Sequence, residues 1–587
     1  MTDGMHPSRL IRILLAVALL ATAGVLMQGY TTDDTYIHLR YAQNLIDRGE
    51  FSFNPGQQSY GATSPLWIFI LAIFLKLGLA PFTAAWLAGV LSGLLLLLLL
   101  DAMLERMTFP TGWKPAILLL AAGDVWFVRW TFSGMETPLA TALLLLLLWP
   151  LVSGRGPERA ALWPRYLAWG VAAGLAGLVR PEFVILAPLA LPWLLGFEYA
   201  RAGRRGGARL FRPLLAALSG WMLVLGPWFC YAYLTFGRVT PGTAAAKSSG
   251  MLPSPTAMGE YLFMGIKPLA TTQGLLWVGL VILGMRFVIR KNRNMSTLWT
   301  ELGRADDASA GGGRTTHAPG QDSRGALDSW GAWDSWAVRG PLFLVGIALT
   351  WSLVLLGGYA VKQVWMISRY ISPLAPVLLL ALGVMAAWLT DGQSQEGRGH
   401  RAEGDRAEGR WASRGVLLGV VLLTLLGNAW IFGDRVVPHA RKFPAGVRAC
   451  YLGMGEWLSR NTEPDAVVAA LDIGAVGYAS ERRVLDLMGL VSPEILAVGA
   501  EMGFPEMVAS GAWVHVPEAT SGRTADYFVD RAEGPPRWVD RVVDGVRFEL
   551  LDTCILEGVG LRESQPWTVA LYRLVSVESR VSDSAGG

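Results

Sequence analysis

The sequence predicts a polytopic α-helical membrane protein that carries a small extracytoplasmic α/β domain at its C-terminal end. Three observations predict this class. The chain of 587 residues is 52% hydrophobic and only 16% charged, and its mean hydropathy of +0.39 exceeds that of soluble domains. Apolar segments of membrane-spanning length recur up to about residue 437. Beyond that point the composition becomes that of a soluble domain.

Eleven segments are expected to span the membrane. The first runs from about Leu10 to Met27 and lacks a small-x-small cleavage site, so we interpret it as a retained span rather than a signal peptide. The other expected spans lie near residues 82–100, 115–129, 138–152, 163–179, 183–196, 213–235, 271–289, 341–359, 371–390 and 415–433. Residues 66–79 form a shorter apolar stretch that contains Lys76, which predicts an interfacial or re-entrant helix.

The distribution of basic residues predicts the orientation of these spans. With residues 66–79 left out of the spans, the most basic loops share the side of Arg9, which the positive-inside rule assigns to the cytoplasm. These loops cover residues 102–114, 153–162, 197–212, 290–340 and 391–414. Because residues 290–340 and 391–414 lack the apolar content for a core, we expect flexible cytoplasmic loops there. The first outer loop, residues 30–81, then faces outward together with the C-terminal region.

The chain is expected to divide into a membrane module, residues 1–437, and an extracytoplasmic α/β domain, residues 438–587. The second part contains an amphipathic helix around VRACYLGMGEWLSRN and strand-like runs such as ADYFVD and WTVALYRLV. Its size of about 150 residues suffices for a core of its own. Its two cysteines, Cys450 and Cys554, either form a disulfide, as an oxidising compartment permits, or remain ordinary buried thiols.

Acidic and basic side chains gather in the loops that are expected to lie outside. Two adjacent acids, Asp33 and Asp34, follow the first span directly, where a charge beside hydrocarbon is costly unless it is solvated or functional. The other outer loops contribute His38, Glu136, Arg180, Glu182, Lys247, Arg369 and Tyr370. Arginine and lysine neutralise phosphate, and a carboxylate accepts a proton from an attacking hydroxyl. This set predicts a site for an anionic lipid headgroup.

Structural explanations also fit the acidic residues of this set. Thr32 or Asp33 suits the N-cap of the helix predicted for TYIHLRYAQNLI. His38 lies four residues after Asp34, on the face of that helix that can meet the acid. Glu136 immediately precedes a span and complements the dipole of its helix. A structural and a functional role therefore remain open for each of these residues.

The basic residues have structural alternatives as well. Arg180 and Glu182 flank a proline and can pair with each other around a tight outer turn. Lys247, in a loop rich in glycine, serine and alanine, can simply be solvated. Arg369 precedes a span and can extend its charge to the membrane interface. These alternatives also stay open.

The first loop carries a resemblance to a known family. The stretch DDTYIHLRY, followed by NPG and YGATSPLW, and the later SGMETP resemble the GT-C glycosyltransferases, in the branch of mycobacterial terminal arabinofuranosyltransferases and their bacterial relatives. The tail segment LDIGAVGY and VLDLMGLVSP resembles the extracytoplasmic tail of many of those relatives. The resemblance implies transfer of a sugar from a polyprenyl-phosphate donor to a glycan, lipid or protein acceptor of the cell envelope. The site would face outward from the inner membrane.

The resemblance also implies roles for individual residues. Asp33 or Asp34 would deprotonate the acceptor hydroxyl, and Arg180, Lys247 and Arg369 would hold the phosphate leaving group. No Cys/His spacing in the sequence indicates a metal site. A monophosphate donor needs a metal less than a pyrophosphate donor does. The adjacent aspartates could still bind a divalent cation.

The sequence was also compared with two other functions, transport and membrane assembly, and with nucleic-acid binding. A transporter or lipid flippase would place ionisable residues at mid-span and show internal hydropathy repeats, and the sequence shows neither. A structural or assembly protein whose tail binds partners would not need Asp33 and Asp34. The net charge of +4 is too small to indicate nucleic-acid binding, so the expected surroundings are membrane lipids.

Overall fold

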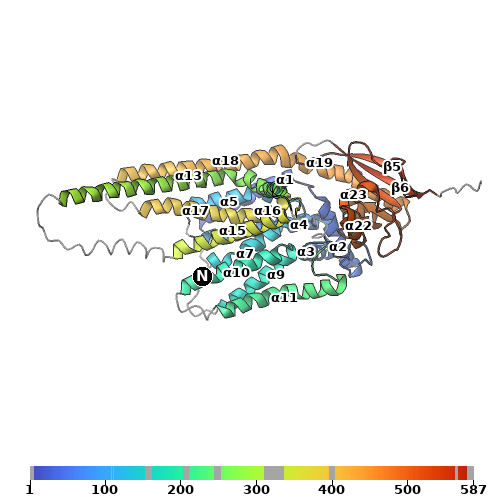
Figure 1. The fold of residues 1–587 in the computed structure, drawn as a ribbon, viewed down its shortest axis with the longest axis horizontal. Coiled ribbons are helices and arrows are strands. Elements are labelled where there is room, and N and C mark those ends of the chain that lie inside the picture. Colours follow the sequence, from blue (N-terminus) through green and yellow to red (C-terminus); the bar gives the residue numbers. More distant parts are fainter. Residues whose placement is uncertain are drawn as a thin grey trace, which may run out of the picture.

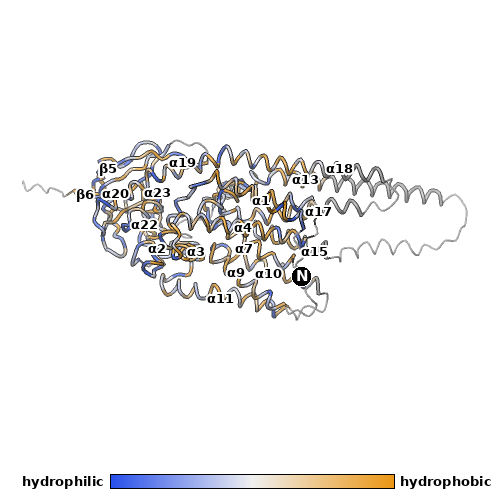
Figure 2. The backbone as a smooth tube through the Cα atoms, turned by 180° about the vertical axis from the view of Figure 1, so that it is seen from behind, coloured by the Kyte–Doolittle hydropathy of each residue, from blue (hydrophilic) through white to orange (hydrophobic). Residues whose placement is uncertain are grey.

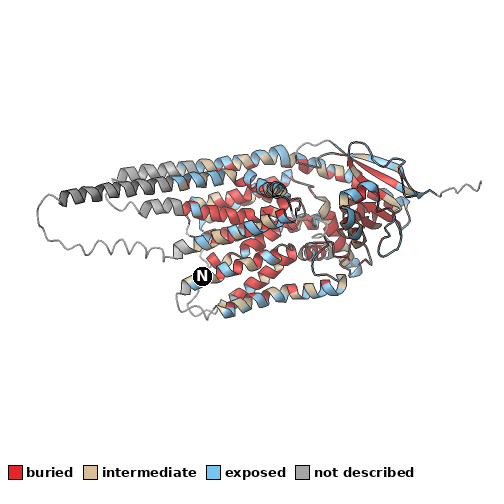
Figure 3. Cartoon of the chain, in the orientation of Figure 1, coloured by how far each residue is buried: buried red, intermediate tan, exposed pale blue. Residues whose placement is uncertain are grey.

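The computed structural model describes residues 6–57, 59–107, 109, 112–152, 162–202, 210–242, 253–309, 336–395, 403–561 and 566–577. Long helices lie roughly side by side in a bundle, and a domain built on a β-sheet lies at one end of it (Figure 1). Hydrophobic residues predominate along the bundle helices (Figure 2). Buried residues line the interior of both the bundle and the C-terminal domain (Figure 3).

The protein is a multi-pass membrane protein. Within the described residues, eight helical segments are long and apolar enough to cross a bilayer. They lie in α1 (Pro7–Leu26), α4 (Pro81–Arg106), α10 (Phe183–Ala202), α11 (Phe211–Phe236), α13 (Pro255–Ser309), α15 (Trp336–Val361), α16 (Ser368–Ile371) continued by α17 (Ala375–Gln395), and α18 (Glu403–Ile431). The apolar stretch that begins at residue 66 forms the short helix α3 (Pro65–Lys76).

Three further expected spans take other forms. Residues 163–179 form the single helix α9 (Leu162–Val179). Residues 115–129 are divided between α5 (Trp113–Ala122) and α6 (Val125–Thr131), because the buried Asp124 caps α6 by accepting from two of its backbone N–H groups. Residues 138–152 are divided between α7 (Thr137–Leu146) and α8 (Trp149–Val152).

The two loops that were expected to be flexible are partly helical. Helix α13 runs on to Ser309, and α18 already begins at Glu403. Both extensions contain arginine, alanine and glutamate residues, which prolong a helix once it has formed. The remainders of these loops, residues 310–335 and 396–402, lie outside the described residues.

The C-terminal domain contains a mixed six-stranded sheet in the order β2-β1-β3-β6-β5-β4. Its strands are β1 (Val467–Ala470), β2 (Arg483–Asp486), β3 (Tyr527–Glu533), β4 (Val542–Val543), β5 (Val546–Leu556) and β6 (Trp567–Ser576). Strand β1 pairs in parallel with β2 and β3, and the remaining pairs are antiparallel.

Successive side chains of β1 point to opposite faces of the sheet, and the two faces pack into different hydrophobic cores. Val467 and Ala469 belong to a core within the domain, which α22 (Pro493–Met502) and α23 (Phe504–Ser510) help to cover. Val468 and Ala470 point to the other face and belong to a core shared with the membrane module. This shared core packs the domain directly against the segment that follows α1, residues 30–76.

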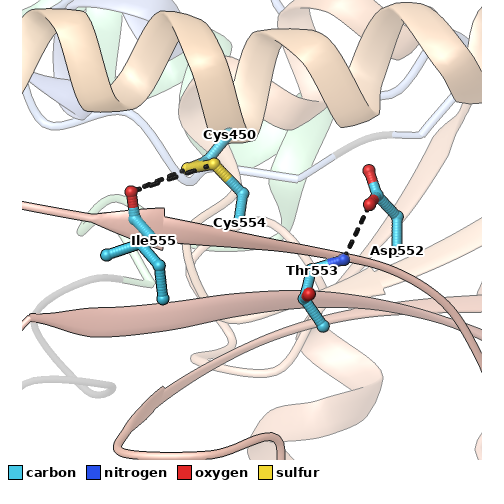
Figure 4. The surroundings of a disulfide bond; sticks show 5 residues. All are labelled: Cys450, Asp552, Thr553, Cys554 and Ile555. Atoms are coloured by element: carbon cyan, nitrogen blue, oxygen red, sulfur yellow. Dashed lines mark hydrogen bonds between the residues drawn. A yellow bond between two sulfur atoms is a disulfide. The ribbon is translucent and has the colours of Figure 1, made fainter.

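A nearly continuous helical run connects the bundle to the sheet. Helix α18 passes through a π-helical turn into α19 (Val437–Val447), and a second π-helical turn, Arg448–Leu452, leads into α20 (Gly453–Asn461). Cys450 in the second π-helical turn forms a disulfide with Cys554 in β5, with 5.4 Å between the Cα atoms (Figure 4). The structure thus selects the disulfide among the two alternatives for these cysteines.

Candidate active site

Helix α2 (Asp33–Arg48) organises the site. Thr32 caps it in a capping box, in which the Thr35 hydroxyl accepts from the Thr32 backbone N–H at 3.4 Å. Thr35 also donates to the Ser133 carbonyl at 2.8 Å, which ties α2 to the SGMETP loop. In that loop Gly134 has φ +78°, and a Cβ there would meet Thr35 at 2.6 Å. The glycine therefore permits the loop to lie directly on α2.

One face of α2 binds the C-terminal domain. The Asp33 carboxylate accepts from the backbone N–H groups of Gly474 at 3.0 Å and Ala475 at 2.8 Å, at the start of α21 (Gly474–Ser480). Arg40, two turns further along, donates to the carbonyls of Gly477 and Arg482. The hydrogen bonds from Gly474 and Ala475 occupy both carboxylate oxygens of Asp33.

The surroundings of Asp33 raise the pKa of its carboxyl group to about 7. Burial is the largest cause, since it disfavours the charged form, and the nearby Asp472 adds like-charge repulsion. The two hydrogen bonds from α21 act in the opposite direction. Asp472 itself accepts from the Tyr451 hydroxyl at 2.6 Å and pairs with Arg531 at 3.0 Å. The network around Asp33 therefore belongs to the interface between the two modules.

Asp34, the next residue of α2, lies in a different environment. Asp34 forms an ion pair with Arg369 of α16. The Asp34 side chain is 37% exposed, whereas that of Arg369 is only 10% exposed. Asp34 is thus an accessible carboxylate beside a cation that is largely withdrawn from water.

Arg180 is the centre of a second group of charges. Its guanidinium donates to Glu136 at 2.9 Å and to Glu182 at 2.5 Å. The guanidinium carbons of Arg180 and Arg369 each lie 5.2 Å from the centre of the Tyr370 ring. Tyr370 therefore joins the Arg180 group to the Asp34–Arg369 pair.

His38 lies in the same cluster, one turn after Asp34. Its ring is buried, and burial lowers the pKa of His38, while the charges of Glu136 and Asp34 act in the opposite direction. Its Nδ1 atom is buried without a hydrogen-bond partner, and so is one carboxylate oxygen of Glu136. Each of these two atoms retains the capacity to form a hydrogen bond within the cluster.

The structure thus brings together most of the residues that the sequence singled out. The cluster, which we call the Asp34–Arg369 cluster, consists of Asp34, His38, Glu136, Arg180, Glu182, Arg369 and Tyr370. Asp33 points away from it toward α21, and Lys247 lies outside the described residues. No group of three or more His, Cys, Asp or Glu side chains suited to a metal ion occurs in the described part of the chain.

A groove at the start of α2 was not predicted from the sequence. An open cavity with a volume of about 740 Å³ is lined by α1, α4, the start of α2 and two residues of the C-terminal domain, Arg448 and Leu452. Thr31 and Tyr36 form part of its lining, so it reaches the N-terminal turn of α2. Since the two domain residues lie at least 400 positions from α2 in the sequence, no local pattern indicated their contribution.

Comparisons with known proteins agree with this architecture. Residues 444–577 match a family described as a domain of unknown function (DUF8728). Over 245 residues the chain is 31% identical to the terminal β-(1→2)-arabinofuranosyltransferase of Mycobacterium tuberculosis (strain ATCC 25618 / H37Rv). This match covers 40% of the chain and 37% of the mycobacterial protein, so it spans little more than a third of that relative.

Two solved structures match almost the whole chain. The crystal structure of ArnT from Cupriavidus metallidurans bound to undecaprenyl phosphate matches with a TM-score of 0.50 and 15% identity, over 96% of this chain and 97% of that one. The apo structure of the same protein matches with a TM-score of 0.53 and 14% identity, over 95% and 97%. The chain therefore has the ArnT-like fold and is related in part of its sequence to a mycobacterial arabinofuranosyltransferase, which confirms the resemblance inferred from its motifs.

Proposed function

We propose that this chain is a membrane glycosyltransferase that moves a sugar from a polyprenyl-phosphate donor to an acceptor of the cell envelope. The observation that carries the proposal is the pairing of an accessible carboxylate, Asp34, with the largely buried Arg369 on an ArnT-like fold. The ArnT of this fold binds undecaprenyl phosphate. The acceptor is a glycan, a lipid or a protein, and the transferred sugar is a pentose or a hexose.

In the proposed reaction, an acceptor hydroxyl attacks the anomeric carbon of the donor sugar. The new bond forms from the acceptor oxygen to that carbon, and the bond from the carbon to the phosphate oxygen breaks. Asp34 takes the proton of the hydroxyl, and polyprenyl phosphate leaves with the bonding electrons. The leaving group needs no proton when its charge is neutralised by nearby cations.

Asp34 suits the role of the base better than Asp33. A general base must first be within reach of the proton that it removes. Both oxygens of Asp33 already accept hydrogen bonds from α21, whereas Asp34 has an accessible side chain. Arg369 forms an ion pair with Asp34, and Glu136, Arg180, Glu182, Tyr370 and His38 act as positioning residues around this pair. Lys247 keeps its predicted role in phosphate binding.

The proposed site faces the outside of the inner membrane. The first outer loop and the C-terminal domain are joined by direct hydrogen bonds, including the one from Gly474 to Asp33. They therefore occupy one side of the bilayer, and the positive-inside rule supports the outer side. Acceptors of the cell envelope and donor lipids both reach this side.

The proposal is tested with membranes that contain the full chain and a panel of radiolabelled polyprenyl-phosphate pentoses and hexoses. We expect label to leave one donor lipid and to appear in an envelope acceptor. The Asp34→Asn variant should lose this transfer, whereas Asp47→Asn, on the exposed side of the same helix, should keep it. If no donor in the panel loses more label with the natural chain than with Asp34→Asn, the proposal is wrong.

A further inference from the structure

The groove between α1 and α4 has the depth of one membrane leaflet. Its lining extends from Val17 to Val25 on α1 and from Phe82 to Leu94 on α4. At 1.5 Å per residue these stretches are about 12 and 18 Å long. The hydrocarbon core of a bilayer is about 30 Å thick, so the groove reaches roughly half-way through it.

The two ends of the groove differ in chemistry. The deep end is lined by apolar side chains such as Leu20 and Leu94. The end near the C-terminal domain contains Gln28, Thr31 and Arg448. Arg448 is the only charged residue in the lining, and no ion pair involves it within the described residues. A single uncompensated cation above an apolar channel matches a lipid with one apolar chain and an anionic headgroup.

The charge balance of the neighbouring cluster supports the same ligand. Arg180 is already compensated by Glu136 and Glu182, and Arg369 by Asp34. Three carboxylates thus surround two guanidinium groups. An arriving phosphate would add to this negative excess, and it would find a better partner in the exposed guanidinium of Arg448.

We propose that this groove is the binding site of the donor lipid, with the isoprenoid chain between α1 and α4 and the phosphate bound by Arg448 of the C-terminal domain. This inference rests on the proposed function. Thr31 lies at the polar end of the groove and three residues before Asp34. A sugar on the bound phosphate would therefore lie beside the N-terminal turn of α2, where Asp34 is placed. The C-terminal domain thereby completes the donor site.

The test measures binding rather than turnover. The full chain is placed in nanodiscs, and the affinities for undecaprenyl phosphate and for uncharged undecaprenol are compared by native mass spectrometry. Loss of a charged hydrogen bond predicts that Arg448→Gln weakens binding of undecaprenyl phosphate about tenfold, with undecaprenol unaffected. Arg448→Lys should retain most of the affinity. The matched control is Arg441→Gln, an exposed arginine on the same helical run that does not line the groove.

A second pair of variants tests the apolar part of the groove. Ala21→Trp places a large ring in the groove and should weaken binding of both lipids. Leu15→Trp changes an exposed position of the same helix outside the groove and should weaken neither. An intact Cys450–Cys554 disulfide and a monodisperse elution profile show that each variant is folded.

Three results would overturn the inference. The first is an equal effect of Arg448→Gln and Arg441→Gln, and the second is an equal effect of Ala21→Trp and Leu15→Trp. The third is displacement of undecaprenyl phosphate by an equal amount of phosphatidylglycerol, which would make the groove an ordinary bilayer contact. Because no sugar transfer is measured, these failures are distinguishable from failure of the proposed function, in which the donor lipid binds as expected but no label is transferred.

Discussion

At the scale of single residues, the two adjacent aspartates of α2 should behave differently when each becomes an amide. Asp34→Asn removes the proposed base and should lower the rate of transfer by about 10²- to 10⁴-fold. Asp33→Asn keeps an oxygen that accepts one of the two hydrogen bonds from α21, so it should retain most of the turnover. Transfer from labelled donor in membranes measures both rates.

The comparison of the two aspartate variants needs a control for folding. Limited proteolysis of the C-terminal domain, run on both variants and on the natural chain, separates loss of transfer from loss of folding. The opposite result, with Asp33→Asn inactive and Asp34→Asn active, would move the base to Asp33. If both variants remain active, Glu136 is the next candidate.

The raised pKa of Asp33 predicts how the contact between α2 and α21 responds to pH. In the closed contact the pKa is about 7, whereas an exposed aspartate has a value near 3.8. Between these values opening of the contact releases a proton, so raising the pH favours opening, and the effect levels off above about pH 7. Hydrogen exchange of the α21 amides, corrected for the intrinsic rate, should show protection that falls from pH 4 to pH 7.

Neighbouring charges define the control for the pH experiment. Asp33 is faced by Asp472 and Asp34, and Arg531 interacts with both Asp472 and Asp33. Asp33→Asn should remove the pH dependence while these charges remain. Protection that rises with pH, or an unchanged pH dependence in the variant, would contradict the assigned pKa.

The sequence predicted well which residues lie at the site. It did not predict which partner each of these residues contacts. Outer-loop position was enough to single out Arg180, Arg369 and Glu136, since short loops at one membrane face must converge. It was not enough to separate Asp33 from Asp34, because the partner of Asp33 is 441 residues away at Gly474. Arg448 was missed because nothing near it in the sequence resembles a site.

At the scale of elements, the close approach of α21 to α2 depends on one glycine. A Cβ at Gly474 would lie 2.1 Å from the Asp33 carbonyl oxygen, so an alanine there forces the two helices apart. Overpacking of this kind costs about 1–3 kcal/mol. We expect Gly474→Ala to lower the thermal unfolding temperature of the C-terminal domain, followed by tryptophan fluorescence.

A nearby glycine provides the matched control. At Gly453, in α20, a Cβ would meet nothing closer than 3.8 Å. Gly453→Ala should therefore leave stability unchanged or raise it slightly, because alanine favours a helix more than glycine does. Equal effects of the two substitutions would show that the α2–α21 contact is not tight.

Hydropathy predicted where helices lie but not where they break. The existence of α1, α4 and α11 follows from apolar length alone. The break between α5 and α6 depends on a single buried acid, Asp124, whose capping bonds a hydropathy average does not detect.

The motif of the first loop contributes to two different contacts. Arg40 and Asn54 in it bind the C-terminal domain, whereas Asp34 and His38 face the Asp34–Arg369 cluster.

At the scale of the whole molecule, the disulfide joins the helical run from the membrane to the far part of the sheet. Cys450 and Cys554 are separated by 104 positions. In the chain-entropy model a closed loop of this length stabilises the folded state by up to about 5 kcal/mol. Cys554→Ala or a reductant should lower the unfolding temperature of the C-terminal domain. Cys230→Ala, which removes the free exposed cysteine, should not.

The shared core gives a topological prediction for the entire chain. Trp67 of α3 and Val468 of β1 belong to one buried cluster, so the first loop and the C-terminal domain occupy the same side of the membrane. Single cysteines at the exposed positions Asp47 and Glu549, in a Cys230→Ala background, should therefore be labelled together by an impermeant maleimide in intact cells. A cysteine at Arg106, at the other end of α4, should be labelled only after permeabilisation, because its end of the bundle carries the basic loops. Labelling of Arg106 alone in intact cells would invert the orientation and place the Asp34–Arg369 cluster in the cytoplasm. Labelling of Asp47 without Glu549 would separate two surfaces that the shared core joins.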